Sequence, residues 1–130
     1  MRDARPFSVG DRMRSFRYAF RGIQCILRTQ HNAWLHALAT AGVVISGMAL
    51  RVSTTEWCLL VLAMMGVWTA EAFNTSLEQL ADAVSPQEHP LVGTAKDVAA
   101  GAVLLSAIGA AIIGLIVFGP RVMAVLMQAP

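Results

Sequence analysis

One stretch of the sequence restricts the fold more than any other. Residues 98–118, VAAGAVLLSAIGAAIIGLIVF, form an apolar segment of 21 residues without a charge. About 20 apolar residues in an α-helix are enough to cross the hydrocarbon core of a bilayer. Two further apolar segments precede it: 33–50, with 18 residues, and a run of 14 residues that begins at Trp57 and ends before Glu71. The pattern predicts three transmembrane helices.

Composition favours a membrane protein over a soluble one. Hydrophobic residues make up 56% of the chain and charged residues 14%, whereas soluble domains carry about 25% charged residues. A soluble domain of 130 residues has too small an interior to bury so much apolar surface. We therefore predict an all-α membrane protein that forms a single domain over 1–130, with its first span at about 33–50.

The second span is expected to be longer than the bilayer is thick. Ser53 and Glu56 have the spacing of a capping box at a helix start, and Pro86 disfavours a helical conformation for Ser85. The helix between them, at about 56–83, would be roughly 40 Å long, against a hydrocarbon core of about 30 Å. We expect it to cross the membrane and to project about two or three turns beyond it.

The distribution of basic residues predicts the orientation. Seven arginines precede the first span and the 84–97 connection holds Lys96, whereas the 51–56 connection and the C-terminal tail hold one arginine each. Cytoplasmic segments near membrane spans are enriched in basic residues. We therefore expect a multi-pass protein of the bacterial plasma membrane with a cytoplasmic N-terminus. The loop at 84–97 would be cytoplasmic and the third span would cover about 98–118.

Residues 8–28 have the pattern of an amphipathic helix that lies on the membrane surface. Apolar side chains recur there at helical spacing and arginines interleave with them, which is typical of interfacial helices. A basic tail that only fixes the topology is the alternative. Because these arginines are tethered to a membrane span, we expect no nucleic-acid partner. The residues are Phe16, Phe20, Ile23 and Leu27, with Arg14, Arg17, Arg21 and Arg28.

The second half of the long helix carries a stripe of polar residues. At about 100° per residue, Glu71, Asn74, Glu78 and Asp82 fall within an arc of about 80°. A solvated face on a projecting helix is an ordinary explanation for Glu78 and Asp82. Glu71 differs, because an ionisable side chain inside a span is costly and is a functional candidate by default. Apolar surroundings also raise the proton affinity of a carboxylate, as a general base requires.

These residue types alone are compatible with two kinds of chemistry. Asn74 can orient a hydroxyl or a phosphate oxygen, and Glu78 suits Mg²⁺, which proteins hold through one or two carboxylates plus substrate phosphates. Lys96, the single lysine of the chain, can neutralise phosphate charge or snorkel to the interface. The stripe therefore predicts either phosphoryl transfer to a lipid hydroxyl or the handling of protons or cations.

Small residues recur every four positions in the third span. This spacing lets another helix approach closely, either within the chain or between subunits. Because three spans form a thin bundle, we expect oligomerisation to complete the site. The residues are Ala102, Ser106, Ala110 and Gly114.

Two motifs, EAFNTSLEQLAD at 71–82 and AKDVAAGAVLL at 95–105, carry a resemblance to a known family. They resemble the hallmark of the small integral-membrane diacylglycerol kinases and undecaprenol kinases of prokaryotes. That hallmark is E-x-x-N-[ST]-x-x-E-x-x-x-D, followed after a fixed interval by A-K-D and an apolar span. The resemblance extends from about residue 16 to residue 118.

The resemblance implies a fold, an activity and a set of site residues. Members have three transmembrane helices and an N-terminal surface helix, and they form homotrimers that share sites between subunits. They transfer the γ-phosphate of MgATP to a lipid alcohol, converting diacylglycerol to phosphatidic acid or undecaprenol to undecaprenyl phosphate. The implied roles are general base for Glu71, metal ligand for Glu78, active-site polar residue for Asn74, and nucleotide binding for Glu78, Asp82, Lys96 and Asp97.

One position departs from the family pattern. The second metal-binding glutamate, expected at the start of the first span, is Gln30 in this chain, so it would give Mg²⁺ a neutral ligand. The tripeptide HPL at 89–91 favours the undecaprenol branch. Two alternatives to a lipid kinase stay open: a small oligomeric transporter that uses Glu71 as a proton site, and a non-catalytic assembly subunit, which the change at Gln30 favours.

Overall fold

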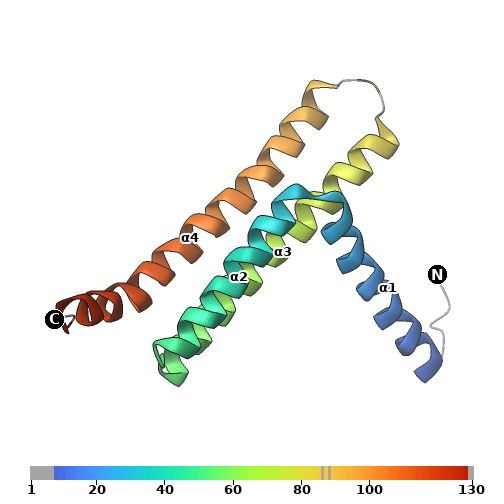
Figure 1. The fold of residues 1–130 in the computed structure, drawn as a ribbon. Helices are drawn as coiled ribbons and strands as arrows, with labels where there is room; N and C mark the ends of the chain where they lie inside the picture. Colours follow the sequence, from blue (N-terminus) through green and yellow to red (C-terminus); the bar gives the residue numbers. More distant parts are fainter. Residues whose placement is uncertain (1–7, 86, 88, 129–130) are drawn as a thin grey trace.

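The computed structural model describes residues 8–85, 87 and 89–128, and these residues form four α-helices and no strand (Figure 1). The expected all-helical architecture is therefore confirmed over this part of the chain. The helices are α1 (Val9–Thr29), α2 (His31–Ala49), α3 (Thr54–Val84) and α4 (Pro90–Gln128).

The helix α1 corresponds to the amphipathic helix expected over 8–28. Ser8 caps its start, because Ser8 Oγ accepts a hydrogen bond from the backbone N–H of Asp11 at 3.4 Å. A single extended residue, Gln30 (φ −106°, ψ 118°), ends α1 and begins α2. This break turns the chain, so α1 diverges from the α2–α3 pair (Figure 1). The side chains of Phe16 and Phe20 are exposed, as an interfacial helix requires.

The start of α3 confirms the capping box. Ser53 Oγ accepts a hydrogen bond from the backbone N–H of Glu56 at 3.4 Å, and Glu56 Oε2 accepts one from the backbone N–H of Ser53 at 2.7 Å. From there α3 continues for 31 residues, which is about 46 Å of helix and exceeds a hydrocarbon core of about 30 Å. This confirms the expectation that the helix exceeds the thickness of the hydrocarbon core.

The prediction of a loop over 84–97 is wrong for residues 90–97, which are helical. The helix α3 ends at Val84, where the backbone N–H of Ser85 still bonds to the carbonyl of Ala81 at 2.9 Å, and α4 already begins at Pro90. Proline is favoured in the first turn of a helix, because its missing N–H would have no partner there. Lys96 and Asp97 therefore lie on a helix, while Pro86 and Glu88 fall outside the described residues.

Two of the helices in the described part are long and apolar enough to cross a membrane, namely α3 and residues Pro90–Met127 of α4. The helix α2 does not meet this test, because His31, Asn32 and His36 occupy its first two turns. Only 28% of the apolar window in α3 and 11% of that in α4 are buried within the chain. These helices are thus not the core of a soluble domain, and their outer faces need lipid or another subunit. Three spans remain an expectation.

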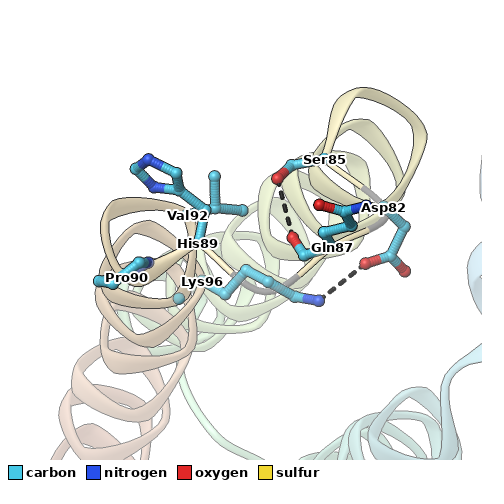
Figure 2. A pocket seen from close by; sticks show the side chains of 8 residues that line it. Asp82, Ser85, Gln87, His89, Pro90, Val92 and Lys96 are labelled. Carbon is cyan, nitrogen blue, oxygen red and sulfur yellow. Dashed lines mark hydrogen bonds and ion pairs between the residues drawn. The ribbon is translucent and has the colours of Figure 1, made fainter.

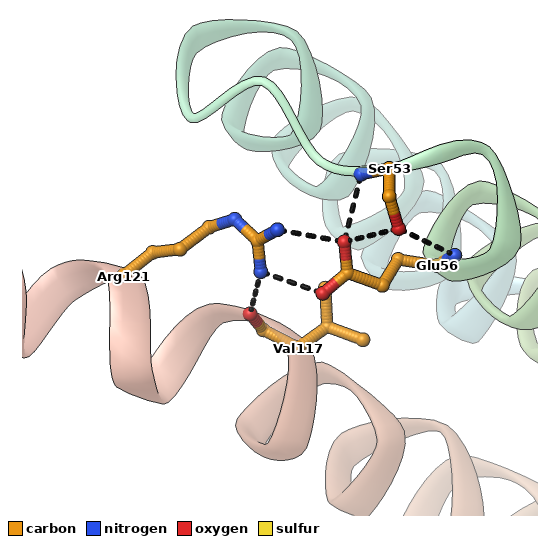
Figure 3. A network of polar contacts seen from close by, with 4 residues as sticks. All are labelled: Ser53, Glu56, Val117 and Arg121. Atoms are coloured by element: carbon orange, nitrogen blue, oxygen red, sulfur yellow. Dashed lines mark hydrogen bonds and ion pairs between the residues drawn. The ribbon is translucent and has the colours of Figure 1, made fainter.

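A polar contact joins Glu56, at the start of α3, to Arg121 of α4 (Figure 3). Arg121 donates two hydrogen bonds to Glu56, at 2.6 and 2.7 Å, and a third to the carbonyl of Val117 at 2.9 Å. Beside it Leu60, Val117 and Val52 form the buried apolar core. This contact ties the start of α3 to α4.

Candidate functional site

The polar stripe of α3 begins with a buried carboxylate. Glu71 is 1% exposed, and neither of its carboxylate oxygens has a hydrogen-bond partner among the described residues. Its backbone carbonyl, by contrast, accepts a hydrogen bond from Thr75 Oγ1 at 2.9 Å. His36 of α2 lies beside the carboxylate, with 3.6 Å between His36 Nε2 and Glu71 Oε2. Both carboxylate oxygens are therefore buried without a hydrogen-bond partner among the described residues.

Two amide side chains converge on the next carboxylate. Asn74 Nδ2 donates to Glu78 Oε1 at 3.1 Å, from one turn earlier on α3. Gln30 Nε2 donates to Glu78 Oε2 at 3.3 Å, and it can do so because Gln30 is the extended residue at the α1–α2 corner. The structure thus brings together three of the predicted site residues, one of which lies more than 40 positions away in the chain.

The side chains around Glu78 can be compared with the ligands that a magnesium ion requires. Within the described part of the chain no three carboxylate, histidine or cysteine side chains are grouped so that they could hold a metal. The cluster supplies one carboxylate, Glu78, and amide oxygens from Asn74 and Gln30; Asn74 Oδ1 is buried and has no partner among the described residues. Magnesium is often held by one or two carboxylates together with substrate phosphates. The donor set fits the ion when phosphates complete it.

The far end of the stripe reaches the α3–α4 turn (Figure 2). Lys96 Nζ donates to Asp82 Oδ1 at 2.9 Å, as Figure 2 shows. This pair borders an open hollow of about 530 Å³, whose lining includes Ser85, His89 and Gly93. Lys96 lies outside the apolar segment, and its hydrogen bond to Asp82 raises the pKa of the ammonium group. Two of the predicted nucleotide-binding residues, Lys96 and Asp82, are therefore in direct contact.

Asp97 lies apart from the contacts that join the other predicted residues of the exposed end. It is exposed on α4, and it follows Lys96 by one position, which turns it about 100° around the helix. No hydrogen bond or ion pair is described for it within the residues that the structure covers. The hollow at the α3–α4 turn is lined by Lys96 but not by Asp97.

Exposure to solvent increases steadily along the stripe. Glu71 is 1% exposed, Glu78 is half-buried, and the side chain of Asp82 is 72% exposed. Glu71 and Asp82 are separated by about 16 Å along the helix axis. One end of the stripe is therefore shielded from water, and the other end is accessible to a water-soluble ligand.

A second, apolar hollow lies among α1, α2 and α3 and was not anticipated from the sequence. Its volume is about 850 Å³, and its lining includes Ile23 and Leu27 of α1, Val44 of α2, and Trp68 and Phe73 of α3. No sequence pattern could have indicated it, because it forms only where three separate helices meet. A groove of this composition suits a hydrocarbon chain.

Comparison with known proteins places this geometry in context. Residues 17–118 match the sequence model of the family described as prokaryotic diacylglycerol kinase. The undecaprenol kinase of Bacillus subtilis is 40% identical over 108 residues, which cover 83% of this chain and 88% of that protein. A diacylglycerol kinase of Synechocystis is 39% identical over 101 residues, which cover 77% of this chain. The chain spans only 58% of the length of this second relative.

Proposed function

The chain belongs to the prokaryotic diacylglycerol kinase family, and from this membership we propose that it transfers the γ-phosphoryl group of MgATP to the hydroxyl of a membrane lipid. The observation that carries the proposal is the stripe on α3, which runs from the buried Glu71 to the exposed pair of Asp82 and Lys96. A lipid hydroxyl and ATP arrive from opposite environments, and the two ends of the stripe match them. Family membership also favours this activity over a proton-coupled transporter.

Glu71 is the proposed general base. As the lipid oxygen bonds to the γ-phosphorus, the hydroxyl proton moves to a Glu71 oxygen and the bond from the γ-phosphorus to the β-phosphate oxygen breaks, which releases ADP. The carboxylate of Glu71 has no hydrogen-bond partner among the described residues, which supports this role because no other donor occupies the oxygens that would take the proton. Asn74, one turn along α3, would orient the reacting oxygens.

The nucleotide would occupy the exposed end of the stripe. Lys96 would exchange its contact with Asp82 for the phosphates of ATP, and the hollow beside the pair supports this placement. Glu78, with amide oxygens from Gln30 or Asn74, would hold Mg²⁺, which when bound offsets the negative charge of the phosphates. Asp97 is proposed to contact the nucleotide from the same turn of α4.

We propose undecaprenol as the preferred lipid, with diacylglycerol as the alternative. The match to the undecaprenol kinase covers 88% of that protein, whereas the match to the diacylglycerol kinase covers 58% of its length. The apolar groove of about 850 Å³ among α1, α2 and α3 would hold part of the lipid chain. Each of these lipids presents one hydroxyl at the membrane interface, so the chemistry at Glu71 would be the same.

We further propose that the chain crosses the bacterial plasma membrane three times, with a cytoplasmic N-terminus, and assembles as a homotrimer. The excess of arginine before α2 supports this orientation, since it places the α3–α4 turn on the side where ATP is present. The largely unburied faces of α3 and α4 support assembly, because a neighbouring subunit would cover part of them.

Phosphorylation of the two lipids tests the proposal directly. Purified protein in mixed micelles would receive γ-labelled ATP and Mg²⁺ with either undecaprenol or diacylglycerol. The expected result is label in the lipid fraction, with more in undecaprenol than in diacylglycerol. Folded protein that labels neither lipid would contradict the proposal and would favour a non-catalytic assembly subunit.

A further inference from the structure

His36 of α2 faces the carboxylate of Glu71. His36 Nε2 lies 3.6 Å from Glu71 Oε2, with side-chain exposures of 16% and 1%. Neither His36 Nε2 nor either carboxylate oxygen of Glu71 has a hydrogen-bond partner among the described residues. Buried polar groups are normally hydrogen-bonded, so each of these side chains is the most readily available partner of the other.

The surrounding contacts hold the imidazole ring at this position. The His36 ring packs edge-on against Trp68 of α3, with 6.2 Å between the ring centroids. The indole N–H of Trp68 donates to Thr40 Oγ1 at 3.1 Å, which ties α2 to α3 one turn beyond His36. On another side His36 lines a cavity of about 200 Å³, together with Ala107 of α4. The Trp68 ring and the α2–α3 hydrogen bond therefore keep His36 Nε2 beside Glu71, at a separation slightly longer than a hydrogen bond.

We infer that His36 is a positioning residue for the general base of the proposed kinase. Its Nε2–H donates to one oxygen of Glu71 and so fixes the plane of the carboxylate. The second oxygen then points to the substrate hydroxyl and receives its proton as the new oxygen–phosphorus bond forms. The carboxylic acid that results releases the proton to water after the products leave. This inference rests on the proposed function.

The competing explanation is that His36 only fills space between α2 and α3. The two explanations differ in what they require of the side chain. Packing requires bulk, which leucine supplies, whereas positioning requires an N–H at the place of Nε2, which the longer amide of glutamine supplies and the shorter amide of asparagine does not. Glutamine and asparagine differ by one methylene group, so they form a matched pair.

The test compares variants of the full chain in lipid nanodiscs by their kcat and by their KM for ATP and lipid. We expect His36→Leu and His36→Asn to lower kcat by about 10- to 100-fold, with both KM values changed by about twofold at most. His36→Gln should retain kcat within about fivefold of the unmodified protein. Leu38→Ala is the control, because Leu38 lies on the same helix and is 73% exposed; it should leave kcat unchanged.

A double variant shows whether His36 acts through Glu71. In a protein that already carries Glu71→Gln, the further change His36→Leu should lower the residual rate by no more than about twofold, because residues that act as a unit are not additive. Equal kcat for the Leu, Asn and Gln variants would overturn the inference, and so would full additivity. If His36→Leu does not fold, the Asn and Gln pair decides alone. An inactive unmodified protein would overturn the proposed kinase and this inference together, whereas an active protein with an active His36→Leu variant would overturn only the inference.

Discussion

At the scale of single residues, Glu78 is where the predicted site residues converge. Its two carboxylate oxygens accept hydrogen bonds from Asn74 Nδ2 at 3.1 Å and from Gln30 Nε2 at 3.3 Å. An amide that donates through nitrogen must turn to present its oxygen before it can ligate a cation. The identity of residue 30 should therefore control how readily the cluster takes up Mg²⁺.

We predict that Gln30→Glu lowers the Mg²⁺ concentration for half-maximal lipid phosphorylation by about tenfold, because a charged oxygen replaces a neutral amide beside Glu78. Without Mg²⁺ the two carboxylates would repel each other, so the melting temperature of the variant should fall in a chelator and recover when Mg²⁺ is added. Gln79→Glu is the matched control, since Gln79 is exposed and contacts Cys25 rather than Glu78. An unchanged Mg²⁺ dependence in Gln30→Glu would place residue 30 away from the metal.

Lys96 gives a second prediction at this scale. Its ion pair with Asp82 is exposed, and exposed pairs contribute little to stability. We therefore expect Lys96→Ala to raise the KM for ATP by about tenfold or more while leaving the melting temperature nearly unchanged. Lys96→Arg, which keeps the positive charge, should retain more of the ATP affinity. A Lys96→Ala variant with an unaltered KM would exclude Lys96 from the nucleotide site.

Sequence reasoning could place these residues on one helix face but could not pair them across helices. The helical period alone puts Glu71, Glu78 and Asp82 in one stripe. The contact of Gln30 with Glu78 depends on the one-residue break between α1 and α2, and the approach of His36 to Glu71 depends on how α2 packs against α3. The period of a single helix does not encode such distances. The contact of Asp82 with Lys96 likewise depends on the short connection between α3 and α4, which was expected from the sequence to extend to residue 97.

At the scale of the elements, signals in the sequence marked helix starts better than connections. The capping box at Ser53 and Glu56 was predicted and is present. The connection after α3 was expected to extend to residue 97, because the apolar segment of the third span begins at residue 98. Pro90 instead occupies the first position of α4, where proline is favourable. Proline therefore disfavours a helix in the helix interior but favours it in the first turn.

The contact between α2 and the start of α3 gives a prediction about stability. A Cβ atom added to Gly47 would lie 2.6 and 2.8 Å from atoms of the Trp57 ring, whereas one added to Gly42 would meet nothing within 4 Å. Gly47→Ala should therefore displace Trp57 and destabilise the fold by about 1–3 kcal/mol. Gly42→Ala, on the same helix, should be neutral or slightly stabilising. Thermal unfolding in detergent compares the Gly47→Ala and Gly42→Ala variants. Equal melting temperatures would show that α2 and the start of α3 can move apart with little loss of stability.

At the scale of the whole molecule, the chain is an open bundle with few buried side chains. Most of the apolar surface of α3 and α4 is not covered within one chain, and α1 diverges from the other helices (Figure 1). Composition alone predicted a membrane protein, and both the exposed faces and the family are consistent with that. Neither the number of spans nor the number of subunits follows from a single chain, because both depend on surroundings that the chain itself does not contain.

We predict that the protein in mild detergent contains three copies of the 13.9 kDa chain. Helix faces with small residues at every fourth position, such as the one in α4, favour close association in membranes. Light scattering corrected for bound detergent measures the protein mass of the complex. A fully active monomer would contradict an assembly that completes the site.

Phosphoryl transfer within a single turnover tests the central claim most directly, namely that the stripe on α3 joins a base for a lipid hydroxyl to a site for ATP. Protein in nanodiscs would be saturated with labelled ATP and mixed with lipid, and the rate of labelling and the Kd for ATP would be measured for Glu71→Gln and for the unmodified chain. We predict that Glu71→Gln slows transfer by about 100-fold or more, while the Kd for ATP changes by about twofold at most. Transfer at the unmodified rate, or loss of ATP binding in parallel with transfer, would contradict this account.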